Sequence, residues 1–333
     1  SDALIESGLV DAVLIATPHF SHTTIGIAAL EAGLHVLVEK PISPHKADGE
    51  RLIAAHTNPD QVFAAVFNQR TDARFRKIHS LLQSGELGEI RRIQWTITTW
   101  FRSEAYYQSS AWRATWKGEG GGVLINQCPH HLDLMQWMLG MPVSVRAFCQ
   151  FGRYHDIEVE DEVIAYLEYP NGATGLLVTS TGEAPGTNRL EIAGENGRLV
   201  FENDRLEFMR NESGAQAFSR ATDELFGAPT STLEEIAVED ARSDQHDEIL
   251  RNFTAAILDG TPLIAPAGEG LRSVELANAM LLSTWTDQTV ALPMSSEIYE
   301  SLLKEKMRRG RPLLEENEAT VRTPVNLKKS FSA

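Results

Sequence analysis

The chain has 333 residues, of which 42% are hydrophobic and 23% are charged, and it carries a net charge of −16 at pH 7. A chain of this length is expected to form more than one hydrophobic core, so we expect two domains. The acidic charge argues against nonspecific binding to nucleic acid or to an anionic membrane surface. Two cysteines and the lack of an apolar run of about 18 residues argue against a disulfide-rich secreted domain and a membrane span, so we expect a cytoplasmic protein.

The start of the chain predicts parallel strands joined by helices. The second segment reads as a helix that Gly33 ends, because glycine readily adopts the left-handed conformation that stops a helix. Short connections between such elements predict right-handed crossovers within one parallel sheet. Three apolar runs alternate with two helical stretches, in the order 11–16, 19–32, 34–38, 44–56 and 62–67.

Lys40 lies in the segment Glu39-Lys40-Pro41, directly after the second apolar run. Ligands of open α/β sheets bind at the carboxyl ends of the strands, so a charged pair at this place indicates a site. A lysine that is partly desolvated there can exchange protons near neutral pH, because burial lowers its pKa. The Lys40–Pro41 bond is also a candidate for a cis peptide. The alternative is an ordinary surface pair before a turn.

Other polar side chains follow the strands at the same predicted edge. Thr17, His19 and His22 come after the first run, and Asn68 comes after the third. The carboxyl ends of neighbouring parallel strands meet at one edge, so we expect these side chains to lie near Lys40.

A glycine run at residues 120–122 precedes a second polar cluster. Asn126, His130 and Asp133 are spaced i, i+4 and i+7, which predicts that they share one face of a helix. Pro129 predicts a kink or a late start of that helix. The alternative makes His130 a core histidine with satisfied hydrogen bonds and Asp133 a surface charge. No third ligand stands at a spacing typical of zinc sites, so we expect no metal.

The remainder of the chain predicts a second, mainly antiparallel sheet. Consecutive strand patterns separated by turn signals such as Pro170-Asn171-Gly172 indicate hairpins. We expect an irregular surface segment at 211–240, and helices at 74–84, 244–259 and 268–287. The expected strands are 89–101, 143–151, 161–169, 172–181, 189–193, 197–201 and 205–209.

These motifs together resemble one known family, the glucose–fructose oxidoreductase, inositol dehydrogenase and rhizopine-catabolism (Gfo/Idh/MocA) family. The resemblance implies NAD- or NADP-dependent oxidation or reduction of a hydroxyl or carbonyl group of a sugar, polyol or sugar derivative. It also implies a homodimer or homotetramer. The matching segments stand in the family's order, at residues 16–22, 39–41, 112–113 and 120–133.

The resemblance also implies roles for individual residues. Lys40 is the family's characteristic lysine and His130 its acid/base residue, and an unperturbed histidine titrates near neutral pH. Asn126 stands where the family often has aspartate. Its amide cannot take a proton but can bond a substrate hydroxyl. The implied substrate-binding residues are Lys40, Asn126, His130 and Arg113, and the implied cofactor-binding residues are Thr17, Pro18, His19, His22, Glu39, Lys40, Asn68, Trp112 and Arg113.

The predicted fold class is therefore α/β, with a partial Rossmann-type parallel sheet followed by an α+β domain that has a large, mainly antiparallel sheet. We place the dinucleotide-binding part at residues 1–68 and the substrate-binding and oligomerisation part at residues 69–333. No Gly-rich turn of the G-x-G-x-x-G type precedes the first apolar run. We therefore expect the first strand–helix–strand unit of the Rossmann domain to be missing, through truncation rather than loss of the site.

Two alternative functions remain open at this stage. The first is redox-neutral elimination or hydrolysis assisted by bound NAD. The second is a sugar-sensing regulator without turnover, which Asn126 mildly favours and the intact Lys40 and His130 oppose. The sequence does not choose between NAD and NADP or identify the sugar.

Overall fold

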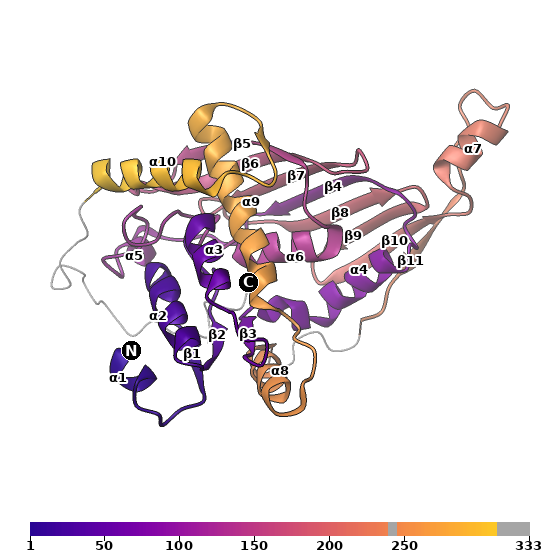
Figure 1. Cartoon of the computed structure of the whole chain (residues 1–333). Helices are drawn as coiled ribbons and strands as arrows, with labels where there is room; N and C mark the ends of the chain where they lie inside the picture. The colour runs from indigo at the N-terminus through magenta and orange to yellow at the C-terminus, as the bar shows by residue number, and fades with distance from the viewer. Residues whose placement is uncertain (239–244, 312–333) are drawn as a thin grey trace.

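A computed structural model describes residues 1–238 and 245–311 of the chain. Its first sheet is parallel and has the strand order β1-β2-β3 (Figure 1). Val13 pairs with Val36, which in turn pairs with Phe63. This arrangement confirms the predicted parallel unit. The strands are β1 (Ala12–Ile15), β2 (His35–Val38) and β3 (Phe63–Ala65).

Short helices connect and flank the strands of this sheet. The connection from α2 to β2 turns at Gly33, whose φ of 87° is a conformation that glycine adopts without strain. Val36, Val38 and Ile15 are buried in the core between the sheet and the helices. The helical elements are α1 (Asp2–Ile5), α2 (His19–Glu31), α3 (Lys46–Ala54) and the 3₁₀ helix η1 (Asn68–Thr71).

The second sheet has nine strands among the described residues, in the order β11-β10-β9-β8-β4-β7-β6-β5-β12. Neighbouring strands are antiparallel except for β4 and β7, which are parallel. The two sheets confirm the predicted α/β fold class. The strands are β4 (Ile90–Ile97), β5 (Ser144–Phe151), β6 (Glu160–Glu168), β7 (Thr174–Ser180), β8 (Asn188–Gly194), β9 (Gly197–Glu202), β10 (Arg205–Asn211), β11 (Ser231–Glu235) and β12 (Val290–Ala291).

The two faces of the large sheet differ in what covers them. Alternate residues of a strand face opposite sides, so Val145 and Ala147 of β5 are buried while Phe148 is exposed. The buried side packs against helices, with α9 on β5 and α6 beside α9 (Figure 1). These helices are α4 (Ala73–Gln83), α6 (Pro129–Leu139) and α9 (Ala267–Thr286).

The chain returns from the large sheet to cover the small one. Ile249 and Phe253 of α8 (Gln245–Asp259) pack in one cluster with Leu37 and Val66. The backbone N–H of Ala65 donates to the carbonyl oxygen of Ala265, at 3.0 Å. Residues far along the chain thus complete the first core, and the boundary between residues 68 and 69 stays a prediction. Two more helices are α5 (Glu104–Tyr107) and α10 (Ser296–Arg309).

The part of the chain that the structure describes contains no candidate for a membrane-spanning helix. No helix there combines the length and the apolar composition that a bilayer crossing requires.

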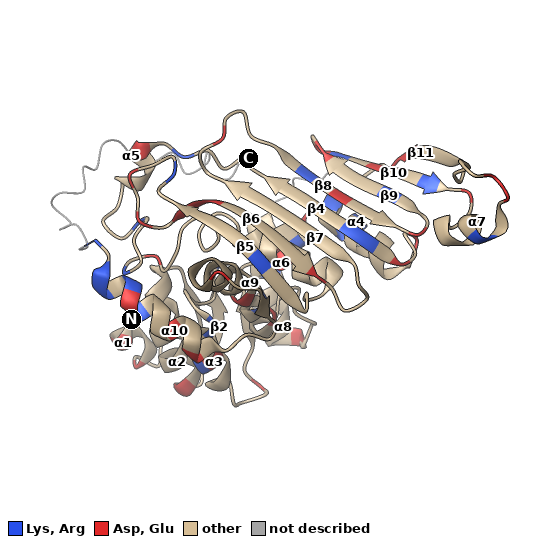
Figure 2. Ribbon diagram, turned by 90° about the horizontal axis from the view of Figure 1, so that it is seen from above, with Lys and Arg blue, Asp and Glu red and all other residues tan. Residues whose placement is uncertain are grey.

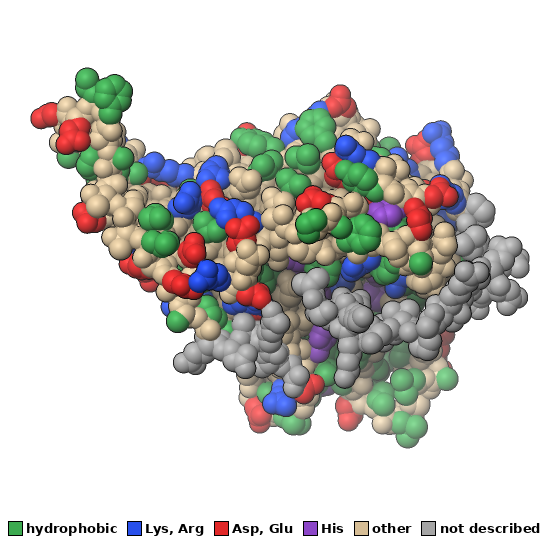
Figure 3. Space-filling view, turned by 180° about the vertical axis from the view of Figure 1, so that it is seen from behind, with side chains coloured by type: hydrophobic (Ala, Val, Ile, Leu, Met, Phe, Trp, Pro, Cys, Tyr) green, Lys and Arg blue, Asp and Glu red, His purple; other side chains and the backbone are tan. Residues whose placement is uncertain are grey.

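The expected irregular segment at 211–240 is corrected by the structure. Residues 215–221 form helix α7 and residues 231–235 form β11, which pairs with β10 through Met209 and Leu233. Main-chain hydrogen bonds to β10 stabilise this strand although its side chains are exposed. The resulting arm carries α7, projects from the edge of the sheet (Figure 1) and shows hydrophobic side chains at its tip (Figure 3). Leu225 and Phe226, in the loop between α7 and β11, are exposed. Positions 239, 240 and 244 of the expected segments lie outside the described residues.

A buried ion pair fixes α6 against the small sheet. The Nε and Nη2 of Arg70 donate to the two carboxylate oxygens of Asp133 at 2.7 and 2.6 Å, and both side chains are 1% exposed. Glu269 binds the same guanidinium through Nη1. Asp133 is therefore a buried partner of Arg70 and not the surface charge of the alternative interpretation.

Replacement of Asp133 by asparagine should lower the free energy of unfolding by about 3–5 kcal/mol, because Arg70 would stay buried with less of its charge compensated. Urea denaturation measures the change. Glu248→Gln at the exposed Arg76–Glu248 pair is the control and should change stability by about 1 kcal/mol or less. Equal losses in both variants would contradict a structural role for the buried pair.

Candidate active site

Lys40 lies where the two parts of the molecule meet. It follows β2 at the carboxyl edge of the small sheet, and the Lys40–Pro41 peptide is cis, as expected. Its Nζ donates to the backbone carbonyl oxygen of Asn126 at 2.8 Å. Burial lowers the pKa of the Lys40 ammonium, and the nearby carboxylates of Glu39 and Glu119 oppose that shift. The lysine is thus held at the edge by a residue 86 positions away along the chain.

The two histidines of α2 bond backbone carbonyl groups around the sheet edge. The ring of His22 bonds the carbonyl oxygens of Pro41 at 2.8 Å and Thr17 at 2.7 Å, while the Nδ1 of His19 bonds that of Glu119 at 3.0 Å. Burial lowers the pKa of His19 to about 3, so its imidazole is neutral at physiological pH. Thr17 and Pro18 stay exposed at the same edge. These contacts place the sequence-predicted residues of the first strand beside Lys40.

The glycine run forms a turn that only small residues fit. A Cβ at Gly122 would lie 2.0 Å from the carbonyl oxygen of Glu160, and Gly120 has a φ of 84°. The Glu160 carboxylate accepts from the backbone N–H groups of Gly122 at 2.9 Å and Leu124 at 3.0 Å. Strand β6 therefore holds the turn in place, and the turn presents Asn126 to Lys40.

The prediction that Asn126, His130 and Asp133 share one face of a helix is wrong for Asn126. Helix α6 begins at Pro129, so the late start is confirmed and Asn126 lies in the turn before the helix. Proline suits the first helical position because it lacks the N–H that would be unpaired there. Asn126 instead directs its amide to Glu119 and to the Tyr106 hydroxyl at 3.4 Å.

His130 lies in the first turn of α6, facing Phe67 at a ring-centroid distance of 6.1 Å. Burial lowers its pKa well below the usual value, and the positive charge of Lys40 acts in the same direction. The expectation that His130 titrates near neutral pH is therefore wrong for this structure. Its Nδ1 is buried and has no hydrogen-bond partner among the described residues.

Trp112 and Arg113 reach the site from the second part of the chain, as the sequence predicts. The rings of Trp112 and His19 lie 5.6 Å apart, and the Nη1 of Arg113 donates to the Tyr106 hydroxyl at 2.8 Å. Asn68 is less central, because its amide nitrogen donates to Gln245 of α8 at 3.0 Å.

Glu119 belongs to this site and was not predicted from the sequence. Its carboxylate accepts from the backbone N–H of Ala114 at 2.7 Å and from the Nδ2 of Asn126. Burial raises the pKa of Glu119 to about 7, while the amide of Ala114 and the charges of Arg113 and Lys40 oppose the shift. In the sequence, the only indication of a role for Glu119 was its position directly before a glycine run. Its contact with Asn126 can be seen only in the folded chain.

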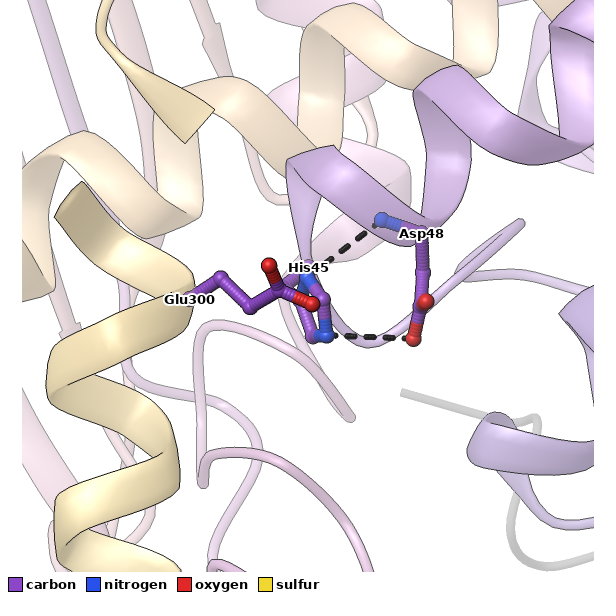
Figure 4. Close-up of side chains that lie close together, drawn as sticks. All are labelled: His45, Asp48 and Glu300. Atoms are coloured by element: carbon purple, nitrogen blue, oxygen red, sulfur yellow. Dashed lines mark hydrogen bonds and ion pairs between the residues drawn. The ribbon is translucent and has the colours of Figure 1, made fainter. Parts of the chain in front are cut away.

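A second cluster, away from this site, joins α3 to α10 (Figure 4). The ligand-type atoms of His45, Asp48 and Glu300 lie within 4.8 Å of one another. Arg51 donates to both carboxylates, and Lys304 lies 3.0 Å from Glu300. These cations already compensate the acidic groups, so we assign the cluster to helix packing.

The chain belongs to the Gfo/Idh/MocA family. Residues 1–67 match the model of the oxidoreductase family with an NAD-binding Rossmann fold, and residues 75–200 match the model of the GFO/IDH/MocA C-terminal domain. These two segments contain Lys40, Asn126 and His130, the residues on which the resemblance in the sequence depends.

Among similar proteins, the myo-inositol 2-dehydrogenase of Thermotoga maritima is 29% identical over 210 residues, which are 61% of this chain and 59% of the relative. The chain thus spans about three-fifths of that relative in the match. The scyllo-inositol 2-dehydrogenase (NADP(+)) of Bacillus subtilis is 25% identical over 297 residues, which are 85% of this chain and 79% of the relative.

Solved structures show the same fold. The WlbA dehydrogenase from Bordetella pertussis, in complex with NADH and UDP-GlcNAcA, aligns with a TM-score of 0.73 at 24% identity over 89% of this chain and 83% of that chain. A levoglucosan dehydrogenase in complex with NADH and L-sorbose aligns with a TM-score of 0.73 at 20% identity, covering 88% and 82% of the two chains.

Replacement of Glu119 by glutamine should change how stability depends on pH. A carboxyl group whose pKa rises from 4.5 to about 7 on folding destabilises the protein as pH rises through that interval, since the unfolded chain ionises first. Glutamine removes this effect, so between pH 4.5 and 7 the variant should gain on the order of 3 kcal/mol relative to wild type. Denaturant titrations at several pH values measure the gain, and parallel pH dependences would contradict the buried, neutral carboxyl.

Proposed function

We propose that the protein is an NAD(P)-dependent oxidoreductase that acts on a hydroxyl or carbonyl group of a sugar, polyol or sugar derivative. The observation that carries the proposal is the convergence of Lys40, Asn126 and His130 at the carboxyl edge of the Rossmann-type sheet. Family membership and dehydrogenase relatives support hydride transfer over the redox-neutral and regulatory alternatives. In this proposal residues 1–68 bind the dinucleotide, and residues 69–333 bind the substrate and a partner subunit.

The residues at the edge fit the nicotinamide half of a dinucleotide. Two buried polar atoms that lack a partner among the described residues belong to this group, namely the Oδ1 of Asn68 and the Nδ1 of His130. Bound NAD or NADP would supply the hydride acceptor or donor, and the protein would position it. The residues proposed to hold it are Thr17, Pro18, His19, His22, Glu39, Lys40, Asn68, Trp112 and Arg113.

The protein's own groups would handle the proton. In the oxidation direction the neutral imidazole of His130 accepts the hydroxyl proton, and its depressed pKa keeps the base form available at physiological pH. The Nζ of Lys40 donates a hydrogen bond to the same oxygen and stabilises the alkoxide as it develops. Asn126 bonds a neighbouring hydroxyl through its amide, whose orientation Glu119 sets.

Lys40→Met should reduce kcat by more than tenfold in the intact protein, because methionine keeps the length of the side chain and loses its charge. A loss of transition-state stabilisation of about 1.4 kcal/mol or less would make Lys40 structural.

His130→Ala should lower kcat on the order of 10²-fold or more. Absorbance of NADH or NADPH at steady state measures both, and circular dichroism controls for folding. From the sequence, His130 was expected to make the rate change with pH between about 6 and 8. Because burial lowers the pKa of His130 well below its usual value, we now expect this change in rate at lower pH.

We further propose that the protein is a cytoplasmic homo-oligomer whose subunits meet through the outer face of the large sheet. On that face Phe148, Ile164 and Tyr166 are 56%, 42% and 43% exposed, and Phe148 pairs with Ile164 across β5 and β6. Charged side chains lie farther across the sheet, on β4 and β8 (Figure 2). There Arg92 of β4 pairs with Glu191 of β8. An apolar patch of this kind favours self-association. Cell fractionation would test the location.

Phe148→Glu should dissociate the oligomer, because the two copies of the new carboxylate would be buried together near the symmetry axis. Light scattering after size-exclusion chromatography measures the molar mass. Phe226→Glu is the matched control, since Phe226 is also exposed but lies on the arm, and the control should keep the subunit contact. A wild-type mass equal to one chain would contradict the proposal.

A further inference from the structure

Two arginines beside the candidate active site have no carboxylate partner in the part of the chain that the structure describes. Most arginines of this acidic protein form ion pairs, as Arg70 does with Asp133. Within residues 1–238 and 245–311, no ion pair joins Arg102 or Arg113 to a carboxylate, although both are partly buried. The Nε atoms of both side chains are buried and have no acceptor among those residues. Unpaired buried donors destabilise a protein unless a ligand or water bonds them.

The two guanidinium groups lie on one aromatic ring. The Cζ of Arg102 is 5.0 Å and that of Arg113 is 4.5 Å from the centroid of Tyr106. Trp100 and Trp112 provide the next rings, at 5.5 Å from Arg102 and 4.7 Å from Arg113. Stacking on aromatic rings orients a guanidinium and leaves its edge available for hydrogen bonds.

This pair borders the reaction centre. The Tyr106 hydroxyl that accepts from Arg113 also accepts from the Nε2 of Gln127 at 3.2 Å and lies 3.4 Å from the Nδ2 of Asn126. The backbone carbonyl of Asn126 in turn holds Lys40. An anion bound at the arginine pair would therefore lie next to the group that Lys40 contacts.

The charges around the pair do not balance. The charges of Arg102 and Arg113 both act on the cation of Lys40, and the carboxylates that act on Lys40 are Glu39 and Glu119. One positive charge is left over, and two are left over when Glu119 is protonated. Cations gathered in a poorly solvated site repel one another, and a bound anion removes that repulsion.

We propose that the substrate carries an anionic group, a carboxylate or phosphate, that binds at Arg102 and Arg113 beside Tyr106. The proposal rests on the proposed dehydrogenase function and narrows its substrate class to acidic derivatives of sugars or polyols. A guanidinium bonds such a group through two parallel N–H donors, and each charge-assisted bond is stronger than a neutral one. The hydroxyl or carbonyl to be oxidised or reduced then lies at Lys40.

The test uses the intact protein and matched substrates with NAD and NADP: D-glucose with D-glucuronate, D-galactose with D-galacturonate, and D-glucose with D-glucose 6-phosphate. We expect kcat/KM for one anionic class to exceed that for its neutral partner about tenfold or more. The uronates and the phosphate ester distinguish the two anions. Equal or greater activity on the neutral sugars would overturn the proposal.

Arg102→Gln should remove that preference by raising the KM of the anionic substrate, with the KM of the cofactor changed less than about twofold. A rise in the cofactor KM with the substrate preference intact would assign the pair to the cofactor phosphates and overturn the proposal. Arg210→Gln is the matched control, because Arg210 also stacks on a ring, that of Phe208 at 4.2 Å, but pairs with Glu86 and Glu234. The control should keep the preference.

Two further measurements test the anion site: one uses only the wild-type protein, so no variant has to fold, and the other does not require turnover. In wild type, added KCl should raise the KM of the anionic substrate and leave that of the neutral sugar unchanged, which needs no variant. If wild type turns over none of these sugars, melting temperatures decide the anion site without turnover. D-glucuronate or D-glucose 6-phosphate should then raise the Tm of wild type more than D-glucose does, and equal shifts would overturn the proposal.

Discussion

The hydrogen bond from the Nζ of Lys40 to the backbone carbonyl of Asn126 is the contact on which the candidate active site depends. It joins the carboxyl edge of the parallel sheet to the turn before α6, two segments with no local connection in the chain. A buried ammonium needs an acceptor, and a main-chain carbonyl provides one without adding a negative charge. The bond orients the Nζ of Lys40 within the site, where burial lowers the pKa of its ammonium.

Two buried acidic groups position the elements around this bond. Glu160 of β6 holds the glycine turn through two backbone N–H groups, and Asp133 holds α6 through Arg70. The turn carries Asn126 and the helix carries His130, so the two acidic groups fix the segments that bring both residues to Lys40. Supporting contacts of this kind hold the groups of a site in place before a ligand binds.

Burial determines the charge state of the site. It lowers the pKa values of His19 and His130, which keeps both imidazoles neutral, and it raises those of Glu119 and Glu160 to about 7, so that these carboxyl groups are partly protonated at neutral pH. The charges that remain are mainly cationic, in a protein whose net charge is −16. Local charge in the site thus opposes the overall charge of the molecule, which favours the binding of an anion there.

The sequence alone determined the order and type of most elements and the residues of the sheet edge. Hydrophobic periodicity and turn residues depend on near neighbours, so the strands around Val36 and Ile164 and the late start of α6 at Pro129 were predictable. Only the tertiary structure decided which distant groups meet: Glu119 with Asn126, Asp133 with Arg70, and Arg102 with Arg113 on Tyr106. It also decided the depressed pKa of His130, because desolvation depends on packing from all sides, and no local pattern records that packing.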